Sequence, residues 1–334
     1  MQIGKICLRH GLILAPMAGY TDHATRAVSH ACGAEYTVTE MVSAKAICYG
    51  DRKTPVLARI FPEDGPCAVQ IFGSDPEYMA EAAVRLSEGM AGGEKPAAVD
   101  INAGCPVPKV TGNQEGSALM RAPGQLYRIV QAICTRIKIP VTVKIRAGWD
   151  GAHRNAPEVA RAAEAGGASA VAVHGRTRDA MYAGRADWAI IGAVKKAVGI
   201  PVIGNGDVTD AASALLLLRE SGADGIMIGR GALGNPYIFR EIGAALEGRP
   251  VVPATPEELY SMACRQLVLR AAEKGEASAV RESRKLLAWY LRGFPTASAA
   301  RARIYAAESL SEMQAALAVL LQKDAWKDAA PRAF

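Results

Sequence analysis

Residues 201–231 read PVIGNGDVTDAASALLLLRESGADGIMIGRG, and this stretch is the most informative about the fold. An apolar run at 201–203 precedes an Ala- and Leu-rich segment at 211–219, which ends near Gly222, and a second apolar run follows at 225–228. This order predicts a strand, a helix and a second strand. Two strands connected through a helix run parallel, with a right-handed crossover.

The same alternation extends over most of the chain. Eight short apolar runs, rich in valine and isoleucine, are separated by amphipathic segments. Most of the runs lack polar alternation, which is typical of strands buried on both faces. Eight such units predict a (β/α)₈ TIM barrel, and the alternation alone leaves a doubly wound open sheet as the alternative. The runs lie at 12–15, 36–41, 68–72, 97–101, 141–145, 170–173, 201–203 and 225–228.

The pattern changes after about residue 247. Strand-like runs stop, and a proline-containing connector at 248–256 leads into stretches with helical patterning. Short joints between these stretches predict a small C-terminal helical bundle. We therefore expect a barrel domain at 1–247 and a helical domain at 248–334. The expected helices lie at 257–273, 278–292, 296–306 and 309–322.

Composition limits the class of protein. Half of the residues are hydrophobic and 22% are charged, and no apolar run approaches the roughly 18 residues that span a membrane. The seven cysteines are scattered without a CxxC pair, which argues against a disulfide framework and a zinc site. Free thiols indicate a reducing compartment. We expect a cytoplasmic monomer without a metal, whose net charge of +6 is compatible with a polyanionic partner.

Glycine-rich turns follow the last two predicted strands. Barrels bind phosphate at these positions through backbone N–H groups, and Arg230 adds a permanent cation to the GRG turn at 229–231. The alternative is that the glycines of the GNGD turn at 204–207 only permit a tight turn. Thr209 stands where a dinucleotide fingerprint would have its third glycine, so the stretch does not match that motif.

Other strand ends carry residues suited to flavin chemistry. The amide of Gln70 could bond the pyrimidine edge of an isoalloxazine, and Lys144 could stabilise the negative charge that develops there on reduction. Lys144 could instead pair with a buried carboxylate such as Asp100. Cys105 lies in the NAGCP turn at 102–106, which would hold its thiol at the barrel mouth. A buried thiol remote from cations stays protonated and can act as a general acid, whereas the alternative is an inert cysteine.

Together these segments resemble the tRNA-dihydrouridine synthases, particularly the bacterial B-type branch related to nitrogen-regulation protein 3. The likeness runs from about residue 10 to 245 in the order and spacing of the family, and it continues in part of the tail. The most specific string is NAGCP. The matching strings are APMAGYTD at 15–22, DINAGCP at 100–106, KIRAGW at 144–149, VHGRTR at 173–178, GNGD at 204–207, GRG at 229–231, RK at 284–285 and WYL at 289–291.

The resemblance implies an FMN-containing barrel that reduces uridine in tRNA to 5,6-dihydrouridine, with NADPH as the electron source. It implies hydride transfer from flavin N5 to uracil C6 and proton transfer from Cys105 to C5. Arg176 and Arg178 could meet the tRNA near the flipped base. The residues implied to contact the flavin or the target base are Pro16, Met17, Ala18, Gln70, Asn102, Lys144, His174, Asn205, Gly206, Asp207, Gly229 and Arg230.

The tail could supply further RNA contacts. Its basic side chains recur at intervals of three and four residues, which predicts a shared helical face that would meet phosphates. The alternative is an ordinary solvated basic face. The residues are Arg281, Arg284, Lys285 and Arg292.

Two segments depart from the family pattern. Residues 112–116 read GNQEG where the family has a glycine-rich stretch, which leaves the RNA contacts of this loop open. Asp179-Ala180 stands in place of the family's Glu-Gln. Two other functions also remain open: an FMN barrel that reduces a small molecule, such as a dihydroorotate- or enone-type reductase, and an RNA-binding regulator with a structural flavin. The basic tail and the Cys105 turn disfavour the first, and the intact set of Cys105, Lys144 and His174 disfavours the second.

Overall fold

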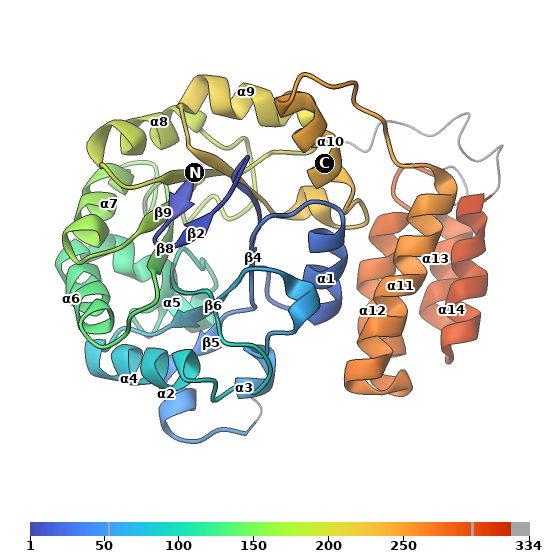
Figure 1. The fold of residues 1–334 in the computed structure, drawn as a ribbon, viewed down its shortest axis with the longest axis horizontal. Coiled ribbons are helices and arrows are strands. Elements are labelled where there is room, and N and C mark those ends of the chain that lie inside the picture. Colours follow the sequence, from blue (N-terminus) through green and yellow to red (C-terminus); the bar gives the residue numbers. More distant parts are fainter. Residues whose placement is uncertain (53, 295–296, 322–334) are drawn as a thin grey trace.

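A computed structural model describes residues 1–52, 54–294 and 297–321, and within them the predicted parallel barrel is confirmed (Figure 1). Neighbouring strands pair in the order β3-β11-β10-β9-β8-β7-β6-β4, and a parallel bridge between Ile13 and Tyr36 joins the two ends. This ring rules out the open sheet. The strands are β3 (Leu12–Leu14), β4 (Thr37–Val38), β5 (Val42–Ser43), β6 (Cys67–Phe72), β7 (Ala98–Ala103), β8 (Val141–Arg146), β9 (Ala170–His174), β10 (Val202–Asn205) and β11 (Gly225–Ile228).

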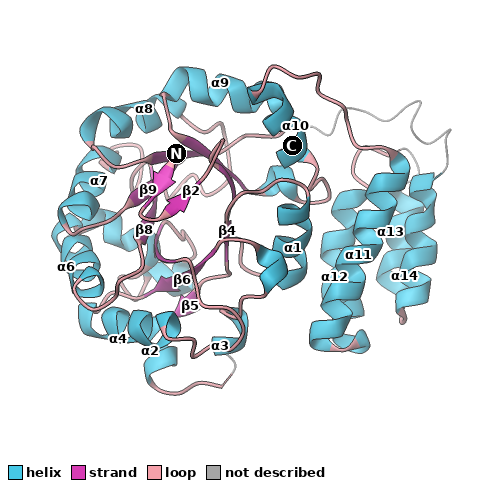
Figure 2. Cartoon of the chain, in the orientation of Figure 1, coloured by secondary structure: helices cyan, strands magenta, loops and turns pink. Residues whose placement is uncertain are grey.

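Helices surround the strands on the outside of the ring (Figure 2). Local signals set their ends: Asp75 caps α4 ahead of Pro76, and Asp210 and Ser213 form a capping box at the start of α9. Gly222 ends α9 in the left-handed conformation, at φ +64°. The helices are α1 (His23–Ala31), α2 (Ala44–Cys48), α3 (Thr54–Leu57), α4 (Pro76–Ser87), α5 (Pro108–Thr111), α6 (Pro123–Cys134), α7 (Ala156–Ala165), α8 (Trp188–Ala197), α9 (Ala211–Ser221) and α10 (Ile238–Leu246).

A short antiparallel hairpin, β1 (Gln2–Ile3) with β2 (Ile6–Cys7), covers the amino end of the barrel (Figure 1). Ile3 and Leu8 belong to the same buried cluster as inward-facing strand residues such as Ala68, Ala170 and Ile203. The hairpin therefore closes the floor of the barrel with apolar side chains. The carboxyl ends of the strands lie at the other end, where polar residues gather.

The predicted helical tail is confirmed as well. Its apolar faces form one buried cluster, which includes Leu267, Leu287 and Tyr290. Of the helices predicted at 296–306 and 309–322, the end residues Thr296 and Gln322 lie outside the described residues. The helices are α11 (Pro256–Lys274), α12 (Glu276–Tyr290), α13 (Ala297–Ala306) and α14 (Leu310–Leu317), followed by the 3₁₀ turn η4 (Ala318–Leu321).

A buried polar network joins the tail to helix α1 of the barrel. Arg270 donates to the two carboxylate oxygens of Asp22 over 2.7 and 2.9 Å, and Lys274 donates over 3.2 Å. Gln266 donates to the Thr25 hydroxyl over 2.8 Å. Burial opposes ionisation of Asp22, but its two cationic partners hold the pKa of this carboxyl well below its ordinary value. Among the helices of the described residues, none is both long and apolar enough to cross a lipid bilayer.

Candidate active site

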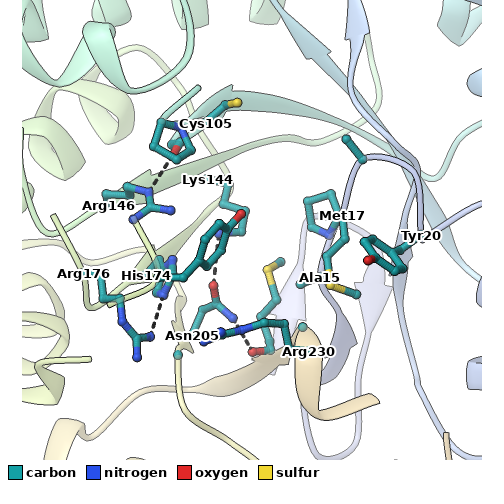
Figure 3. Close-up of a pocket in the computed structure, with 18 of the residues that line it drawn as sticks. Ala15, Met17, Tyr20, Cys105, Lys144, Arg146, His174, Arg176, Asn205 and Arg230 are labelled. Atoms are coloured by element: carbon teal, nitrogen blue, oxygen red, sulfur yellow. Dashed lines mark hydrogen bonds between the residues drawn. The ribbon is translucent and has the colours of Figure 1, made fainter. Parts of the chain in front are cut away.

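A cavity of about 430 Å³ opens among the carboxyl ends of the barrel strands. In the view of Figure 3, Cys105 lies at one side of this pocket and Arg230 at the other, with Lys144 and His174 between them. Residues that were predicted from separate strand ends thus share one wall. Those lining the cavity are Pro16, Met17, Ala18, Gln70, Asn102, Cys105, Lys144, His174, Arg176, Asn205, Gly206, Asp207, Gly229 and Arg230.

The loop that carries Cys105 is held from three sides. The Asn102 side-chain oxygen accepts from the backbone N–H groups of Gly104 (3.1 Å) and Cys105 (2.8 Å). Arg146 donates from Nε to the Gly104 carbonyl over 2.8 Å, and the backbone N–H and hydroxyl of Ser117 both donate to the Cys105 carbonyl. Because these bonds fix the backbone around it, the Cys105 side chain has a defined position in the pocket wall.

The loop at 112–116, whose role the sequence left open, supports the Cys105 turn. Gly116 has φ +60°, and a Cβ there would lie 2.9 Å from the Cys105 carbonyl oxygen and 3.2 Å from the Cys105 Cβ. A larger residue would displace the turn. Gly116, at the end of this loop, therefore packs against the Cys105 turn.

Burial raises the pKa of the Cys105 thiol above its ordinary value. The Val107 N–H and the charges of Arg146 and Lys144 act in the opposite direction but do not reverse the shift. The expectation of a thiol remote from cations is therefore wrong, because two cations lie close enough to act on it. The expected protonated state still follows, since burial outweighs them.

Lys144 projects into the cavity. Its ammonium donates to the Asn205 side-chain oxygen over 3.1 Å, and no ion pair among the described residues joins it to Asp100. Asp100 instead accepts from Gln70 (2.7 Å) and from Thr142. Burial and the charge of Arg146 lower the pKa of Lys144 to about 8.

His174 is neutral. Arg176 can only donate, so its contact of 3.3 Å with Nε2 makes this nitrogen the acceptor and places the ring proton on Nδ1. Burial and the charges of Lys144, Arg146 and other nearby cations hold the pKa of His174 well below its ordinary value. An uncharged ring on this wall could contact a flat ligand without adding a charge.

The turns after β10 and β11 form a cradle for an anion. Gly206 has φ +121°, and a Cβ there would lie 2.6 Å from that of Ala186, so the turn requires glycine. Asp207 accepts from Arg176 and from the Ala186 N–H, both over 2.6 Å, and Arg230 lies 3.9 Å from it. Within the described chain, no hydrogen bond uses the backbone N–H of Gly206, Asp207, Gly229 or Arg230. Free N–H groups beside a guanidinium fit a phosphate.

Comparison with known proteins identifies the family. The family model described as "Dihydrouridine synthase (Dus)" matches residues 13–327. The chain belongs to the dihydrouridine synthase family. It is 43% identical over 310 residues to tRNA-dihydrouridine synthase B of Pseudomonas putida, covering 92% of this chain and 90% of that protein. It is 41% identical over 302 residues to a probable tRNA-dihydrouridine synthase of Treponema pallidum, covering 88% of each.

These matches confirm the predicted family and its B-type branch, and with them the oxidoreductase class. The fold also resembles that of histamine dehydrogenase from Rhizobium sp. 4-9, at a TM-score of 0.54 and 15% identity, covering 80% of this chain and 50% of that one. At such identity the likeness concerns the fold alone. It agrees with the barrel described above.

The two arginines that were predicted to contact RNA near the target base, Arg176 and Arg178, have different surroundings. Arg176 is 4% exposed, and its guanidinium bonds Asp207 and the carbonyls of Ala183 and Gly184, so this dihydrouridine synthase uses it inside the pocket wall. Arg178 lies outside the lining and over the Trp149 ring.

The basic residues of the tail differ in the contacts that they make within the protein. Arg284 donates to the Ala307 carbonyl over 3.0 Å, which ties α12 to the end of α13. Arg292 follows the end of α12 and lies over the Trp289 ring. Lys285 is exposed and lies over Tyr20 at the pocket, and Arg281 is exposed as well. Arg281, Arg284 and Lys285 lie on α12 at the predicted spacing of three and four residues, whereas Arg292 lies beyond the end of that helix. The RNA-binding face stays a prediction.

The lining residues that were not predicted as site residues include Arg146, Tyr182 and Trp289. A signal existed for Arg146, since it stands two positions after Lys144 on β8 and strand side chains alternate between faces. Tyr182 lies in a loop, with Arg146 and Arg230 at 5.6 and 5.2 Å from its ring centre. Trp289 lines the pocket from the tail, and no local sequence pattern predicts that contact.

Proposed function

We propose that this dihydrouridine synthase reduces uridines in tRNA to 5,6-dihydrouridine with FMN as cofactor and NADPH as electron source. The observation that carries the proposal is the pocket itself. A protonated thiol on a fixed loop lies across one cavity from an anion cradle, with Lys144 and His174 between them. Family membership favours this reaction over a small-molecule reductase and over a regulator with a structural flavin.

The lining residues fit the parts of FMN. The phosphate would take the free N–H groups of the turns at 206–207 and 229–230 together with Arg230. Pro16, Met17 and Ala18 would lie along the ring system. Gln70, Asn102, Lys144, His174 and Asn205 would bond or contact the isoalloxazine or the uracil. When bound and reduced, the flavin supplies hydride from N5 to C6 of the uracil.

Cys105 supplies the other hydrogen in this proposal. Its thiol gives a proton to C5 of the uracil, while the electron pair for the new C5–H bond comes from the ring that the hydride has reduced. The thiolate that remains lies near Lys144 and Arg146, whose charges stabilise it until solvent returns a proton. A thiol that stays protonated before the reaction is the form that such a step requires.

We assign residues 1–247 to catalysis and residues 248–334 to tRNA binding. The target base must leave its stack to enter the pocket, at a cost of a few kcal/mol. Phosphate contacts over a wide surface can offset this cost. Of the basic residues considered, Arg178, Arg281, Lys285 and Arg292 remain candidates for such contacts. Arg176 and Arg284 instead position parts of the protein.

Two measurements test the proposal. The purified protein should carry the absorbance spectrum of FMN, and a folded colourless protein that does not take up FMN would contradict the cofactor assignment. Cys105→Ala should retain flavin and lower dihydrouridine formation about 10²-fold or more, because general acid catalysis contributes on that order. Cys134→Ala is the matched control, since Cys134 is also partly buried but lies outside the pocket lining. Equal product from both variants would remove Cys105 as the acid.

A further inference from the structure

Two arginines lie over one tryptophan beside the pocket. The guanidinium carbons of Arg121 and Arg178 are 5.0 and 4.6 Å from the centre of the Trp149 ring. Arg121 is exposed, whereas Arg178 and Trp149 are partly buried. Cation–π contacts hold each guanidinium against the indole, but they do not neutralise its charge.

Neither guanidinium is neutralised within the described chain. No ion pair joins a carboxylate to Arg121 or Arg178 there. The neighbouring Asp150 accepts from His153 instead, and Asp179 accepts from Thr177.

Arg178 has donor capacity that the protein leaves unused. Its Nε is buried without a hydrogen-bond partner in the described residues, and the one hydrogen bond that its guanidinium makes there, to the Thr111 hydroxyl, is long at 3.5 Å. Two like charges on one ring repel each other, so a bound anion would lower the free energy of this arrangement.

The cluster lies at the Cys105 side of the mouth. Trp149 follows Arg146 of β8 by three residues, and Arg178 follows Arg176 of the pocket wall by two. Arg121 ends the 3₁₀ turn η2 (Gly116–Arg121), which packs against the Cys105 loop. Figure 1 shows the adjoining helices α6 and α7 on the side of the barrel away from α11–α14. The pocket therefore lies between this cluster and the tail.

We propose that Arg121, Trp149 and Arg178 form a phosphate-binding subsite for the RNA strand beside the target nucleotide. The inference rests on the proposed function. Guanidinium groups match phosphate with paired N–H donors, and stacking on the indole orders them before the RNA arrives. The subsite holds the strand independently of sequence, opposite the basic residues of the tail, so the strand is supported on both sides of the nucleotide that enters the pocket.

Arg121→Ala tests the subsite, with Arg161→Ala as the matched control. Arg161 is likewise exposed and loses the same charge, but it lies on α7 on the outer wall. Affinity for unmodified tRNA should fall about fivefold in Arg121→Ala, and the slope of log affinity against log salt should decrease by about 1. Arg161→Ala should match the unaltered protein. FMN content and the thermal unfolding midpoint confirm that each variant is folded.

A double-mutant cycle tests the role of the indole. Trp149→Leu should weaken tRNA binding at least as much as Arg121→Ala, and adding Arg121→Ala to it should have a smaller effect than in the unaltered protein. Fully additive effects would overturn the claim that Trp149 orders the arginine.

Two results would overturn the subsite itself. One is equal tRNA affinity in Arg121→Ala and Arg161→Ala. The other is a raised KM for NADPH in Arg121→Ala with unchanged tRNA affinity, because the anion would then be the nucleotide phosphate. If the unaltered protein forms no dihydrouridine, the proposed function fails. If it does and Arg121→Ala behaves like its control, only this inference fails.

Discussion

The barrel–tail interface and the pocket both bury charged side chains, but opposite charges are paired at the interface and unbalanced in the pocket. At the interface, Asp22 accepts hydrogen bonds from Arg270 and Lys274, and Arg270 also donates to Ser283. These charges are therefore paired inside the protein. Among the residues that the structure describes, the pocket is lined by one carboxylate, Asp207, and by the cations Lys144, Arg146, Arg176 and Arg230. Positive charge is thus in excess there.

The pKa shifts reflect this difference. The ion pairs of Asp22 stabilise its charged form and lower its pKa, whereas burial and the charge of Arg146 destabilise the charged form of Lys144 and lower its pKa to about 8. Internal pairing therefore marks a structural contact. A buried excess of one sign marks a place that a ligand of the opposite sign completes.

The largest expected effect concerns the interface. Asp22→Asn preserves the N-cap of α1 but leaves Arg270 buried without its carboxylate, so the free energy of unfolding should fall by about 3–5 kcal/mol. Denaturant unfolding of the purified protein measures it. Glu77→Gln is the control, because its ion pair with Arg136 is solvent-exposed and should contribute far less. Equal losses in the two variants would mean that the buried pair is not structural.

The next effect concerns the pocket and its pH dependence. In the free protein Lys144 loses its proton at about pH 8, well below its ordinary pKa of 10.5. Its buried charge disfavours the folded state at lower pH, so its contribution to stability rises between pH 8 and 10.5. FMN should need the charged form, so flavin affinity should fall above pH 8, by up to about tenfold per pH unit.

Flavin titrations of the apoprotein between pH 7 and 9.5 measure this dependence. Lys144→Met should bind flavin about tenfold more weakly near neutral pH, since a charge-assisted hydrogen bond is lost, and its affinity should not decline above pH 8. A decline that persists in Lys144→Met would assign the titration to another group.

The smallest effect concerns the exposed cations of the tail. Arg281→Ala combined with Lys285→Ala should weaken tRNA binding about threefold and flatten its salt dependence, because both side chains are exposed at the tail surface. Binding titrations at several salt concentrations measure both quantities. Arg284 is bonded inside the protein, so Arg284→Ala breaks its bond to the Ala307 carbonyl and should lower the melting temperature. Unchanged tRNA affinity in the double variant would show that Arg281 and Lys285 are ordinary solvated residues without a role in tRNA binding.

Much of the fold followed from local pattern. The runs at 201–203 and 225–228 became β10 and β11, and the cap at Asp210 starts the helix between them. The run at 36–41 gave only β4 within its bounds, and β5 starts just beyond it. Both short strands pair with β6. The candidate flavin residues could be predicted because each lies in the last part of a barrel strand or just after it, and parallel strands bring those ends together.

By itself, the sequence determined the strand–helix order, the helix caps, the family and the chemistry available at each strand end, because these depend on neighbours along the chain. Only the tertiary structure decided which basic residues pair internally and which keep unused donors. Asp22 and Arg270 are 248 positions apart, and Trp289 reaches the pocket from the tail. The partner of a charge depends on packing between distant segments, and no local period encodes it.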